Sequence, residues 1–570
     1  MFNNYKNITR LSQFLLMLVM VGFIYSCKKT DVIGEDPYAG GKQPLGVKFD
    51  NTLPDPALAT QGSEVTVFIR GLKKYENNYK FYVNEIEATV LNLTDSTARI
   101  KVPNNASTGG LSVTTNEQTF FGPVLTIEGK VSIDDSFQQI NGATYRENNG
   151  NISLASIADL SALPNGNLFL VGGFNNFDNK WTEKVPNGGI AQIDANGAYV
   201  GPIANDPSSI TFGKGANGGL SSITRLSSGT HSGKYIVSGI FSSFNSTRSN
   251  RSNINSITRL NSNGTLDSTI IDVINPTPND LTKNRDTVPT FNGGVLGSIR
   301  KSFVFGNRVY VIGDFQYYVR RFYERSTYDT KVLDIIKMNQ MACLKINETN
   351  PVNEGDLDLT FHYNPVTKQS PAGGNGDITN AIQQPDGKLI LVGSFTTFNG
   401  VPANRIVRIN LDGSVDPSFN VGSGADADIY GITYNATTNK ILITGLFKNF
   451  KNTPKQGVAM LDLDGSLTST FNFGTITQGI PTYAGQLNNG KIIVAGGFKT
   501  YNDVIRQGFM ILNPDGSLAP GYNNTGQFVG TINKIVESAS GANTKVTLIG
   551  YISRFDNRSF KSILRITLKN

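Results

Sequence analysis

One ten-residue pattern recurs along the chain and limits the folds open to it. It reads LVGGFNNFDN at 170–179, LVGSFTTFNG at 391–400 and ITGLFKNFKN at 443–452. The glycine of this pattern recurs seven times, as Gly172, Gly239, Gly313, Gly393, Gly445, Gly496 and Gly550. Successive gaps between these glycines are 67, 74, 80, 52, 51 and 54 residues. A repeat of about 50 residues built from strand-sized pieces predicts a β-propeller or an open solenoid.

The clearest unit, residues 377–422, divides into four strand-like runs. These are DITNAIQQ, KLILVGSF, NRIVRINL and SVDPSFNVG, separated by turns or a short loop. An Asn-Gly or Asp-Gly pair precedes the fourth run in five units: Asn196-Gly197, Asn263-Gly264, Asp412-Gly413, Asp464-Gly465 and Asp515-Gly516. Such pairs supply the positive φ that tight hairpins need. Four antiparallel strands per unit correspond to one blade of a propeller.

The ends of the repeat array favour a closed ring. The last unit contains only three strand-like runs, and the chain then stops. An unassigned run, VSIDDSF at 131–137, precedes the first unit, and its DSF resembles the DPSF of 416–419. If this run completes the last blade, two exposed sheet edges disappear. We therefore predict an all-β protein with a seven-bladed propeller over 129–570, closed by an N-terminal strand.

The recurring pattern is interpreted as a packing feature. Repeated positions in a propeller usually encode contacts between blades, so the apolar pair and the phenylalanine are expected to fill that space. The glycine is expected to permit a close backbone approach or a bulge. On this interpretation, local function should appear where the repeats differ.

The composition agrees with an all-β protein and limits its chemistry. The chain has 60 Gly in 570 residues but only 2 His, 2 Cys and 1 Trp, and charged residues make up 17%. That supply of ligands does not support a zinc site, and no cofactor is expected. The LDLDG at 461–465 lacks the further ligands of a calcium loop. No Lys/Arg-rich run stands out despite the net charge of +7, so a nucleic-acid partner is not expected.

The first 27 residues are interpreted as a secretion signal. Lys6 and Arg10 precede an apolar segment at 11–25, which is too short for a comfortable membrane span. The IYSC that ends it resembles a bacterial lipoprotein lipobox, although Tyr25 occupies a position where a small residue is usual. We expect lipidation of Cys27 and an acyl anchor in the membrane. An ordinary signal peptide with an incidental cysteine is the alternative.

Two further segments lie before the propeller. Residues 28–44 form a polar tether that contains Gly and Pro. Residues 45–128 contain six short strand-like runs broken by Asn, Gly and Pro, which predict a small β-sandwich. VTVFIRGL at 65–72 and ARIKVPNNASTGGLSV at 98–113 resemble the immunoglobulin-like domains called IPT or TIG. That resemblance implies a spacer or a contact module.

The propeller units resemble the delta-60 repeat family of bacterial propellers. The resemblance rests on residues 391–400, on NRIVRINLDGSVDPSFN at 404–420 and on the recurring Asp-Gly turns. The seventh unit departs from the pattern, with Ile552 where phenylalanine is expected. Together with a lipidated cysteine and an IPT-like domain, the arrangement is similar to outer-membrane lipoproteins encoded beside TonB-dependent uptake systems. That similarity implies nutrient capture and supplies no catalytic residues.

The units differ most in the loop between the second and third strands. This loop is short in units 4–7, but it expands in the first three units to 177–189, 245–255 and 316–339. A further insertion, 275–294, joins units 2 and 3. In a four-stranded blade these connections emerge on one face, so we expect them to crowd one side of that face, above adjacent blades.

These insertions carry the candidate binding residues. The aromatic and arginine side chains are Trp181, Tyr317, Tyr318, Arg320, Arg321, Phe322, Tyr323 and Arg325. Aromatic faces stack on sugar rings or peptide side chains, and arginine binds carboxylates with two hydrogen bonds. The same residue types are enriched in protein interfaces. They are therefore expected to contact a glycan or peptide ligand, or instead to cap the propeller or dock another protein.

Enzymatic signatures are weak in this sequence. His231 and His362 lie in different contexts, without a nearby Ser or Cys motif. A pair of glycosidase carboxylates needs only to converge in space, so a polysaccharide-degrading enzyme stays open as an alternative, as does an envelope scaffold. We expect a non-enzymatic, lipid-anchored accessory protein of an outer-membrane nutrient transporter, exposed at the cell surface. The CKKTD after the lipobox leaves the leaflet open, because surface lipoproteins of this kind often carry acidic residues there.

Overall fold

The computed structural model describes residues 44–137, 141–180, 187–206, 208–246, 252–347 and 353–569. Cys27, nearly all of the 28–44 tether and Trp181 lie outside these ranges, so the predictions made for them remain predictions.

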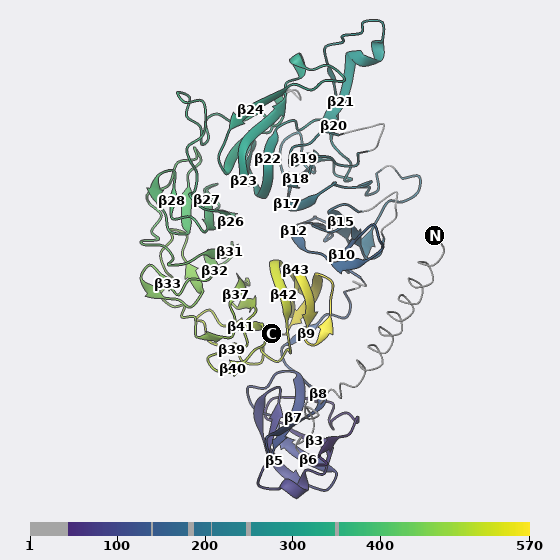
Figure 1. The fold of residues 1–570 in the computed structure, drawn as a ribbon, viewed down its shortest axis with the longest axis vertical. Helices are drawn as coiled ribbons and strands as arrows, with labels where there is room; N and C mark the ends of the chain where they lie inside the picture. Colours follow the sequence, from purple (N-terminus) through teal and green to yellow (C-terminus); the bar gives the residue numbers. More distant parts are fainter. Residues whose placement is uncertain are drawn as a thin grey trace, which may run out of the picture.

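Seven sheets surround a central axis, and the chain is all-β (Figure 1). The innermost strands are β12 (Ile157–Ala162), β17 (Gly219–Arg225), β22 (Gly294–Phe305), β26 (Ile378–Gln383), β31 (Ile429–Asn435), β37 (Pro481–Gln486) and β42 (Val529–Ser540). The second strands are β13 (Leu168–Gly172), β18 (Tyr235–Ile240), β23 (Arg308–Arg321), β27 (Leu389–Gly393), β32 (Lys440–Gly445), β38 (Ile492–Gly496) and β43 (Asn543–Phe555). The third strands are β15 (Ile190–Ile193), β19 (Ile257–Leu260), β25 (Met341–Lys345), β30 (Ile406–Ile409), β35 (Val458–Leu461), β41 (Phe509–Leu512) and β45 (Ile563–Leu568). Each innermost strand contacts the next, and β42 returns to β12.

The predicted closure of the ring is confirmed. β9 (Val131–Ile133) pairs antiparallel with β45, with Val131 opposite Leu568 and Ile133 opposite Ile566. The strand before the first blade therefore completes the seventh, and the final strand of the chain is not an exposed edge.

Seven clusters of buried apolar residues lie between neighbouring blades. In β27, Leu391 faces the cluster shared with blade 3, whereas Ile390 and Val392 face blade 5. A strand buried on both faces needs such a continuous apolar run. Phe395 and Phe398 of the recurring pattern are fully buried in the same cluster as Leu391. The predicted packing role of the pattern is confirmed.

The fourth strand is shorter than predicted. Blade 1 has the two-residue β16 (Tyr199–Val200) and blade 7 has β9, but blade 4 has only the single bridge Ile409–Val415. The chain turns there because the Asp416 carboxylate accepts hydrogen bonds from the backbone N–H and the hydroxyl of Ser418. This side-chain turn replaces the backbone ladder and brings Phe419 into the core between blades 4 and 5.

The seven recurring glycines occupy equivalent places on the second strands. Each pairs with an innermost-strand residue that lies just before a shift in register. A Cβ atom at Gly393 would overlap the carbonyl oxygen of Asp377, and each of the other six would meet the corresponding oxygen of its own blade. The predicted close approach and bulge are therefore both confirmed.

The N-terminal domain is a small β-sandwich of eight strands around one core. Its strands are β1 (Lys48–Phe49), β2 (Leu58–Ala59), β3 (Glu64–Arg70), β4 (Lys80–Val83), β5 (Ile86–Leu93), β6 (Thr97–Lys101), β7 (Gly109–Thr115) and β8 (Gln118–Ile127), with the 3-10 turn η1 (Lys73–Tyr75). β3 alternates strictly, with Val65, Val67 and Ile69 in the core. That alternation is the pattern of a strand with one buried face.

The sandwich is joined to blades 6 and 7 by polar contacts. The buried Asn524 side chain donates to the carbonyls of Ile127 and Val131, at 3.1 and 3.0 Å. Arg506 donates to the carbonyl of Asn105 at 3.2 Å, and Lys499 pairs with Glu85 at 2.5 Å. The Asn524 bonds hold the segment that leads into β9.

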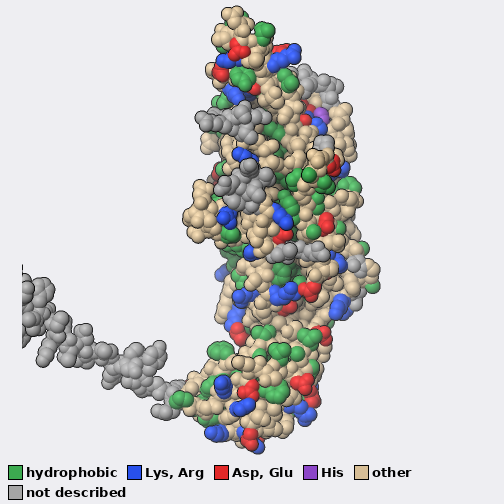
Figure 2. Space-filling model, turned by 90° about the vertical axis from the view of Figure 1, so that its right-hand side faces the viewer, with side chains coloured by type: hydrophobic (Ala, Val, Ile, Leu, Met, Phe, Trp, Pro, Cys, Tyr) green, Lys and Arg blue, Asp and Glu red, His purple; other side chains and the backbone are tan. Residues whose placement is uncertain are grey.

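The large insertions lie at the outer edge of blades 2 and 3, at the end of the molecule opposite the N-terminal domain (Figure 1). They form a hairpin of β20 (Ser268–Asp272) and β21 (Arg285–Pro289), with the 3-10 turn η2 (Leu281–Asn284), and the strand β24 (Leu333–Lys337), which pairs with the distal half of β23. Hydrophobic side chains are visible at this end in Figure 2. Ile270 and Leu281 of the insertion are exposed. We expected these segments above one face, but this hairpin lies outward from the ring.

Smaller rim strands occupy the same loops of other blades. They are β10 (Ala143–Arg146), β11 (Ile152–Leu154), β14 (Asn176–Phe177), β28 (Thr397–Phe398), β29 (Val401–Pro402), β33 (Asn449–Phe450), β34 (Thr453–Pro454), β36 (Ile476–Thr477), β39 (Thr500–Tyr501), β40 (Val504–Ile505) and β44 (Arg558–Ser559). In blade 3 the loop also contains the 3-10 turn η3 (Tyr323–Arg325).

Candidate ligand-binding channel

Two of the predicted binding residues in the blade 3 insertion have buried structural contacts. Tyr318 is 1% exposed, and its hydroxyl donates to the carbonyl of Gly355 at 3.0 Å. Burial raises the pKa of that hydroxyl. Arg321 is 7% exposed, pairs with Asp286 at 2.6 Å and donates to the Thr327 carbonyl at 3.0 Å. Arg321 therefore fastens the β20–β21 hairpin to blade 3.

Arginine and aromatic side chains also stack on one another in this insertion. Phe322 lies between the guanidinium groups of Arg320 and Arg325, at 5.7 and 4.7 Å from its ring centre. Arg320 also forms an ion pair with Asp356. Tyr323 is buried beside Arg321, and burial raises the pKa of its hydroxyl.

The structure therefore brings the predicted residues of the blade 3 insertion together but leaves only part of them accessible. Tyr317 is 39% exposed and Arg325 is exposed, whereas Arg320 and Phe322 are half-buried. The contacts observed are those of a capping insertion. Ligand or partner contact through this insertion stays a prediction, centred on Tyr317 and Arg325.

A second set of residues, which sequence reasoning missed, lies inside the ring. Every innermost strand contains a β-bulge next to the recurring glycine. The bulged residues are Ala158, Ser221, Arg300, Thr379, Tyr430, Thr482 and Asn533, and all seven line one cavity of about 420 Å³. Bulges re-aim side chains. Here they place one side chain from each blade on the wall of the central channel.

Three bulged residues bridge to the following blade. The hydroxyl of Ser221 donates to the Ile299 carbonyl, and that of Thr379 to the Ile429 carbonyl at 2.6 Å. The amide of Asn533 donates to the Ile157 carbonyl at 2.8 Å. Each acceptor belongs to the residue just before the next blade's bulge. These side chains stabilise the ring, and their hydrogen-bonding groups are largely used within it.

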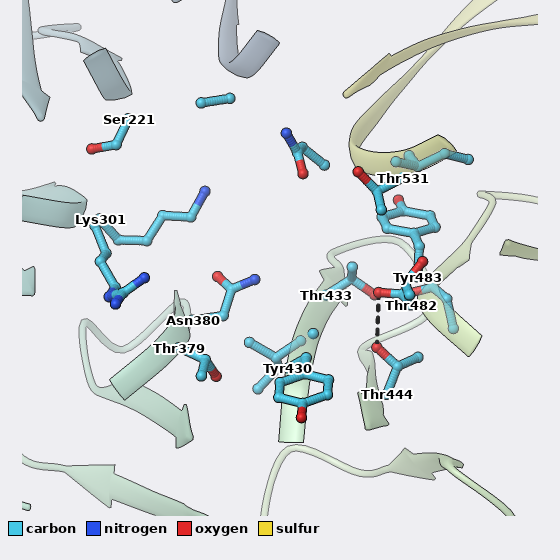
Figure 3. Close-up of a pocket in the computed structure, with 17 residues that line it drawn as sticks. Ser221, Lys301, Thr379, Asn380, Tyr430, Thr433, Thr444, Thr482, Tyr483 and Thr531 are labelled. Carbon is cyan, nitrogen blue, oxygen red and sulfur yellow. Dashed lines mark hydrogen bonds between the residues drawn. The ribbon is translucent and has the colours of Figure 1, made fainter. Parts of the chain in front are cut away.

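The side chains of Arg300, Lys301 and Tyr430 form no hydrogen bond or ion pair with any other residue that the structure describes. Arg300 is exposed to the cavity, and Tyr430 is 39% exposed. Figure 3 shows the Lys301 amine extended into the cavity, with Asn380 between Lys301 and Tyr430. Burial lowers the pKa of Lys301, although the Asp159 carboxylate opposes that shift. Of the lining residues of this cavity, the charged ones are Arg300 and Lys301.

A second cavity, of about 460 Å³, continues the channel and shares Lys301, Asn380 and Tyr483 with the first. Its wall includes Asp159 and Lys534, which form an ion pair at 2.7 Å. Burial alone would raise the pKa of Asp159, but the charges of Lys534 and Lys301 outweigh it and hold that pKa below the usual value. Glu537 lines the same cavity, and burial raises its pKa.

The signal for the first cavity is present in the sequence. The residues that precede the bulges are apolar: Ile157, Leu220, Ile299, Ile378, Ile429, Pro481 and Ile532. The next position varies from alanine to arginine and tyrosine. Aligning the innermost strands, and not only the loops, would have revealed one variable position per blade in a constant setting.

Neither histidine lines the channel cavities. His231 pairs with Glu354 at 2.7 Å, and His362 is 2% exposed. Cys343 is fully buried, and burial raises the pKa of its thiol. Within the described part of the chain, no three His, Cys, Asp or Glu side chains group as metal ligands would. No described helix is long and apolar enough to cross a membrane.

Three segments of the ring match a β-propeller family. This family is described as "Domain of unknown function (DUF5122) beta-propeller", and it matches residues 232–269, 384–419 and 487–521. A second model, "Domain of unknown function (DUF5008)", matches residues 23–123 and so covers most of the N-terminal domain. The comparison with curated proteins gave no match.

Several solved structures are similar over most of the chain. An auxiliary nutrient binding protein from Bacteroides thetaiotaomicron VPI-5482 has 11% identity, a TM-score of 0.27, and coverage of 92% of this chain and 100% of its own. One from Bacteroides ovatus ATCC 8483 has 10% identity, a TM-score of 0.22, and coverage of 91% and 99%. The Dos1 propeller has 11% identity, a TM-score of 0.35, and coverage of 76% and 97%.

Proposed function

We propose that the protein is a non-enzymatic binding protein of an outer-membrane, TonB-dependent nutrient uptake system. In this proposal a lipidated Cys27 anchors it at the cell surface, and the central channel takes a glycan or peptide ligand. One observation carries the binding proposal: seven blades of constant build present one variable side chain each to a common cavity, and two of those side chains, Arg300 and Tyr430, have no polar partner within the described chain.

The cavity has the properties of a binding site for a polar ligand. Its volume of about 420 Å³ lies within the ~300–1,000 Å³ usual for ligand pockets. Its wall combines hydroxyl, amide and cationic groups with the aromatic ring of Tyr430. Hydroxyl-rich sugars and peptides offer matching donors, acceptors and faces.

The position of the N-terminal domain supports anchoring at that end. The domain lies at one end of the molecule, and the β20–β21 hairpin lies at the other (Figure 1). An anchor that precedes the N-terminal domain would therefore attach at the end of the molecule opposite the exposed apolar hairpin. Tyr317 and Arg325 are then the proposed contacts to a transporter subunit.

Binding is tested with the full chain purified from membranes in detergent. Glycan and peptide panels are screened for the unchanged chain, for Tyr430→Ala and for Arg99→Gln, which lies in an exposed ion pair of the N-terminal domain and serves as control. We expect retention of at least one ligand, at least tenfold weaker for Tyr430→Ala and unchanged for Arg99→Gln. Unchanged ligand binding in Tyr430→Ala would count against the channel, and capture of no ligand would count against the function.

The anchor and the transporter are tested separately. Labelled palmitate should be incorporated by the unchanged chain and not by Cys27→Ser. The membrane-purified chain should retain an outer-membrane transport protein, and Arg325→Gln should reduce that retention. Equal labelling of Cys27→Ser would refute the anchor.

A polysaccharide-degrading enzyme is the second candidate, and one pair of carboxyl groups favours it. Glu537 and Asp159 line the same cavity with pKa values moved in opposite directions. Glycosidases use such a pair as an acid and a nucleophile or base. This candidate requires new reducing ends from a glycan panel, lost in Glu537→Gln and Asp159→Asn. No turnover would leave the binding proposal in place.

A further inference from the structure

We infer that the channel recognises an anionic saccharide, one whose sugar rings carry a carboxylate or a sulfate. This inference rests on the proposed binding function and specifies the class of ligand.

Two consecutive cations of blade 3 reach the same cavity. In a regular strand, neighbouring side chains point to opposite faces, so Arg300 and Lys301 would face different neighbouring blades. The bulge at Arg300 shifts the register between Ile299 and Lys301. Both side chains line the cavity as a result. The bulge therefore turns an ordinary Arg-Lys dipeptide into a paired cationic site.

The chain supplies this pair with little internal counter-charge. Asp159 is the carboxylate that acts on Lys301, but it already binds the amine of Lys534 at 2.7 Å and the N–H of Leu160 at 2.8 Å. Arg300 has no described partner.

Three buried arginines of the propeller are paired with carboxylates, whereas the buried Arg506 donates to backbone carbonyls. Arg259 binds Asp267 and Glu354, Arg408 binds Asp416, and Arg565 binds Asp134. Two neighbouring cations in a partly desolvated channel repel one another, and an anion from outside relieves that cost.

The rest of the wall suits a sugar better than a simple inorganic anion. Tyr430 on β31 presents an aromatic ring, and Asn380 on β26 lies between it and Lys301 (Figure 3). A ring face stacks on the apolar side of a sugar, and an amide both donates to and accepts from hydroxyls. An arginine fork binds a carboxylate or sulfate through two parallel bonds. Anion, hydroxyl and ring contacts are thus available in one cavity.

The test compares matched probes by calorimetry on the full chain in detergent. The probes are trigalacturonate, its methyl ester, neutral galactotriose, a sulfated galactose oligosaccharide of the same length, and inorganic phosphate. We expect trigalacturonate or the sulfated probe to bind at least tenfold more tightly than the ester and the neutral sugar. Binding of the acidic probe should weaken between about 50 and 500 mM NaCl, because salt screens charges. The preferred acidic probe decides between carboxylate and sulfate.

Variants then locate the contacts. Arg300→Gln and Lys301→Met should each weaken the acidic probe at least tenfold, with melting temperatures and the affinity for neutral sugar unchanged. Arg99→Gln, in an exposed ion pair of the N-terminal domain, should change neither.

Three outcomes would overturn the inference. They are equal affinity for neutral and acidic sugars, unchanged affinity in both cation variants, and phosphate binding as tight as that of the acidic sugars. After either of the first two outcomes, the proposed function still holds if Tyr430→Ala weakens ligand binding. If no probe binds, the inference fails, and the wider glycan and peptide panel decides the proposed function separately.

Discussion

The Nε of Arg565 donates to the carboxylate of Asp134 at 2.6 Å, although 431 residues separate them in the chain. In blade 4 the same contact joins Arg408 and Asp416 at 2.8 Å, across only 8 residues. Lysines reinforce both carboxylates, Lys545 at 3.0 Å and Lys388 at 2.7 Å. The two ends of the ring are thus joined by the same ion pair that stabilises the inside of a blade.

Removing this closing ion pair should destabilise the whole ring. Asp134→Ala leaves the buried Arg565 without its partner, so we expect a loss of about 3–5 kcal/mol in the free energy of unfolding. The adjacent Asp135→Ala breaks only the exposed pair with Arg558 and should cost no more than about 0.5 kcal/mol. Urea unfolding measures both. Equal effects would contradict a structural role for the Asp134 pair.

The recurring glycines should be intolerant of even one methyl group. A Cβ atom at Gly172 would overlap the Ser156 carbonyl oxygen, whereas one at the neighbouring Gly173 meets nothing within 4 Å. Gly172→Ala should therefore destabilise the protein by about 1–3 kcal/mol, since overpacking forces backbone shifts. Gly173→Ala should be neutral or slightly stabilising. Thermal melts of the two variants provide the comparison, and similar melting temperatures would refute the steric argument.

Acid should weaken the fold through His362. Burial lowers the pKa of this histidine to about 4, against about 6.5 in an unfolded chain. Between pH 6.5 and 4 the unfolded state binds a proton at His362 and the folded state does not. The free energy of unfolding therefore falls by about 3 kcal/mol as the pH drops from 6.5 to 4. Above pH 6.5 the titration of His362 does not change the stability.

The variant His362→Asn isolates this contribution. Asn420 and Asn472 follow equivalent phenylalanines, and their backbone N–H groups bind the next glycine turn as that of His362 does. Urea unfolding at several pH values should therefore give a flatter profile between pH 6.5 and 4 for the variant. Parallel profiles for variant and unchanged chain would show that His362 does not cause the acid sensitivity.

The joint between the sandwich and the propeller should depend on Asn524. Its buried carboxamide bonds to Ile127 and Val131, and Asn524→Ala leaves their carbonyls unsatisfied. We expect a loss of about 1–3 kcal/mol in stability and faster hydrogen exchange at Val131. Asn513→Ala, which removes only a bond to Ser517, serves as control. Unchanged exchange at Val131 would contradict this role.

Sequence patterns predicted the parts of the fold that repetition makes visible. The closing strand was predictable because DSF at 135–137 copies the end of DPSF, and Asp134 and Asp416 make equivalent contacts. The short fourth strands were not, since the side-chain turn at Asp416 competes with a backbone ladder that the residue types also allow.

The binding residues were harder to predict, for two physical reasons. Arg321 looked available because its partner, Asp286, lies 35 residues away on another insertion. Arg300 was missed because strand periodicity assigns each residue to one face, and the bulge that breaks this rule becomes visible only when the seven innermost strands are aligned.

Some of the bulged positions line the channel without contributing to the assembly of the propeller. The side chains of Ala158, Arg300 and Tyr430 form no hydrogen bond or ion pair with another described part of the propeller, so exchanging them leaves the scaffold intact. Single codon changes at such sites can therefore alter the lining of the channel, while the glycines and ion pairs that hold the architecture stay untouched.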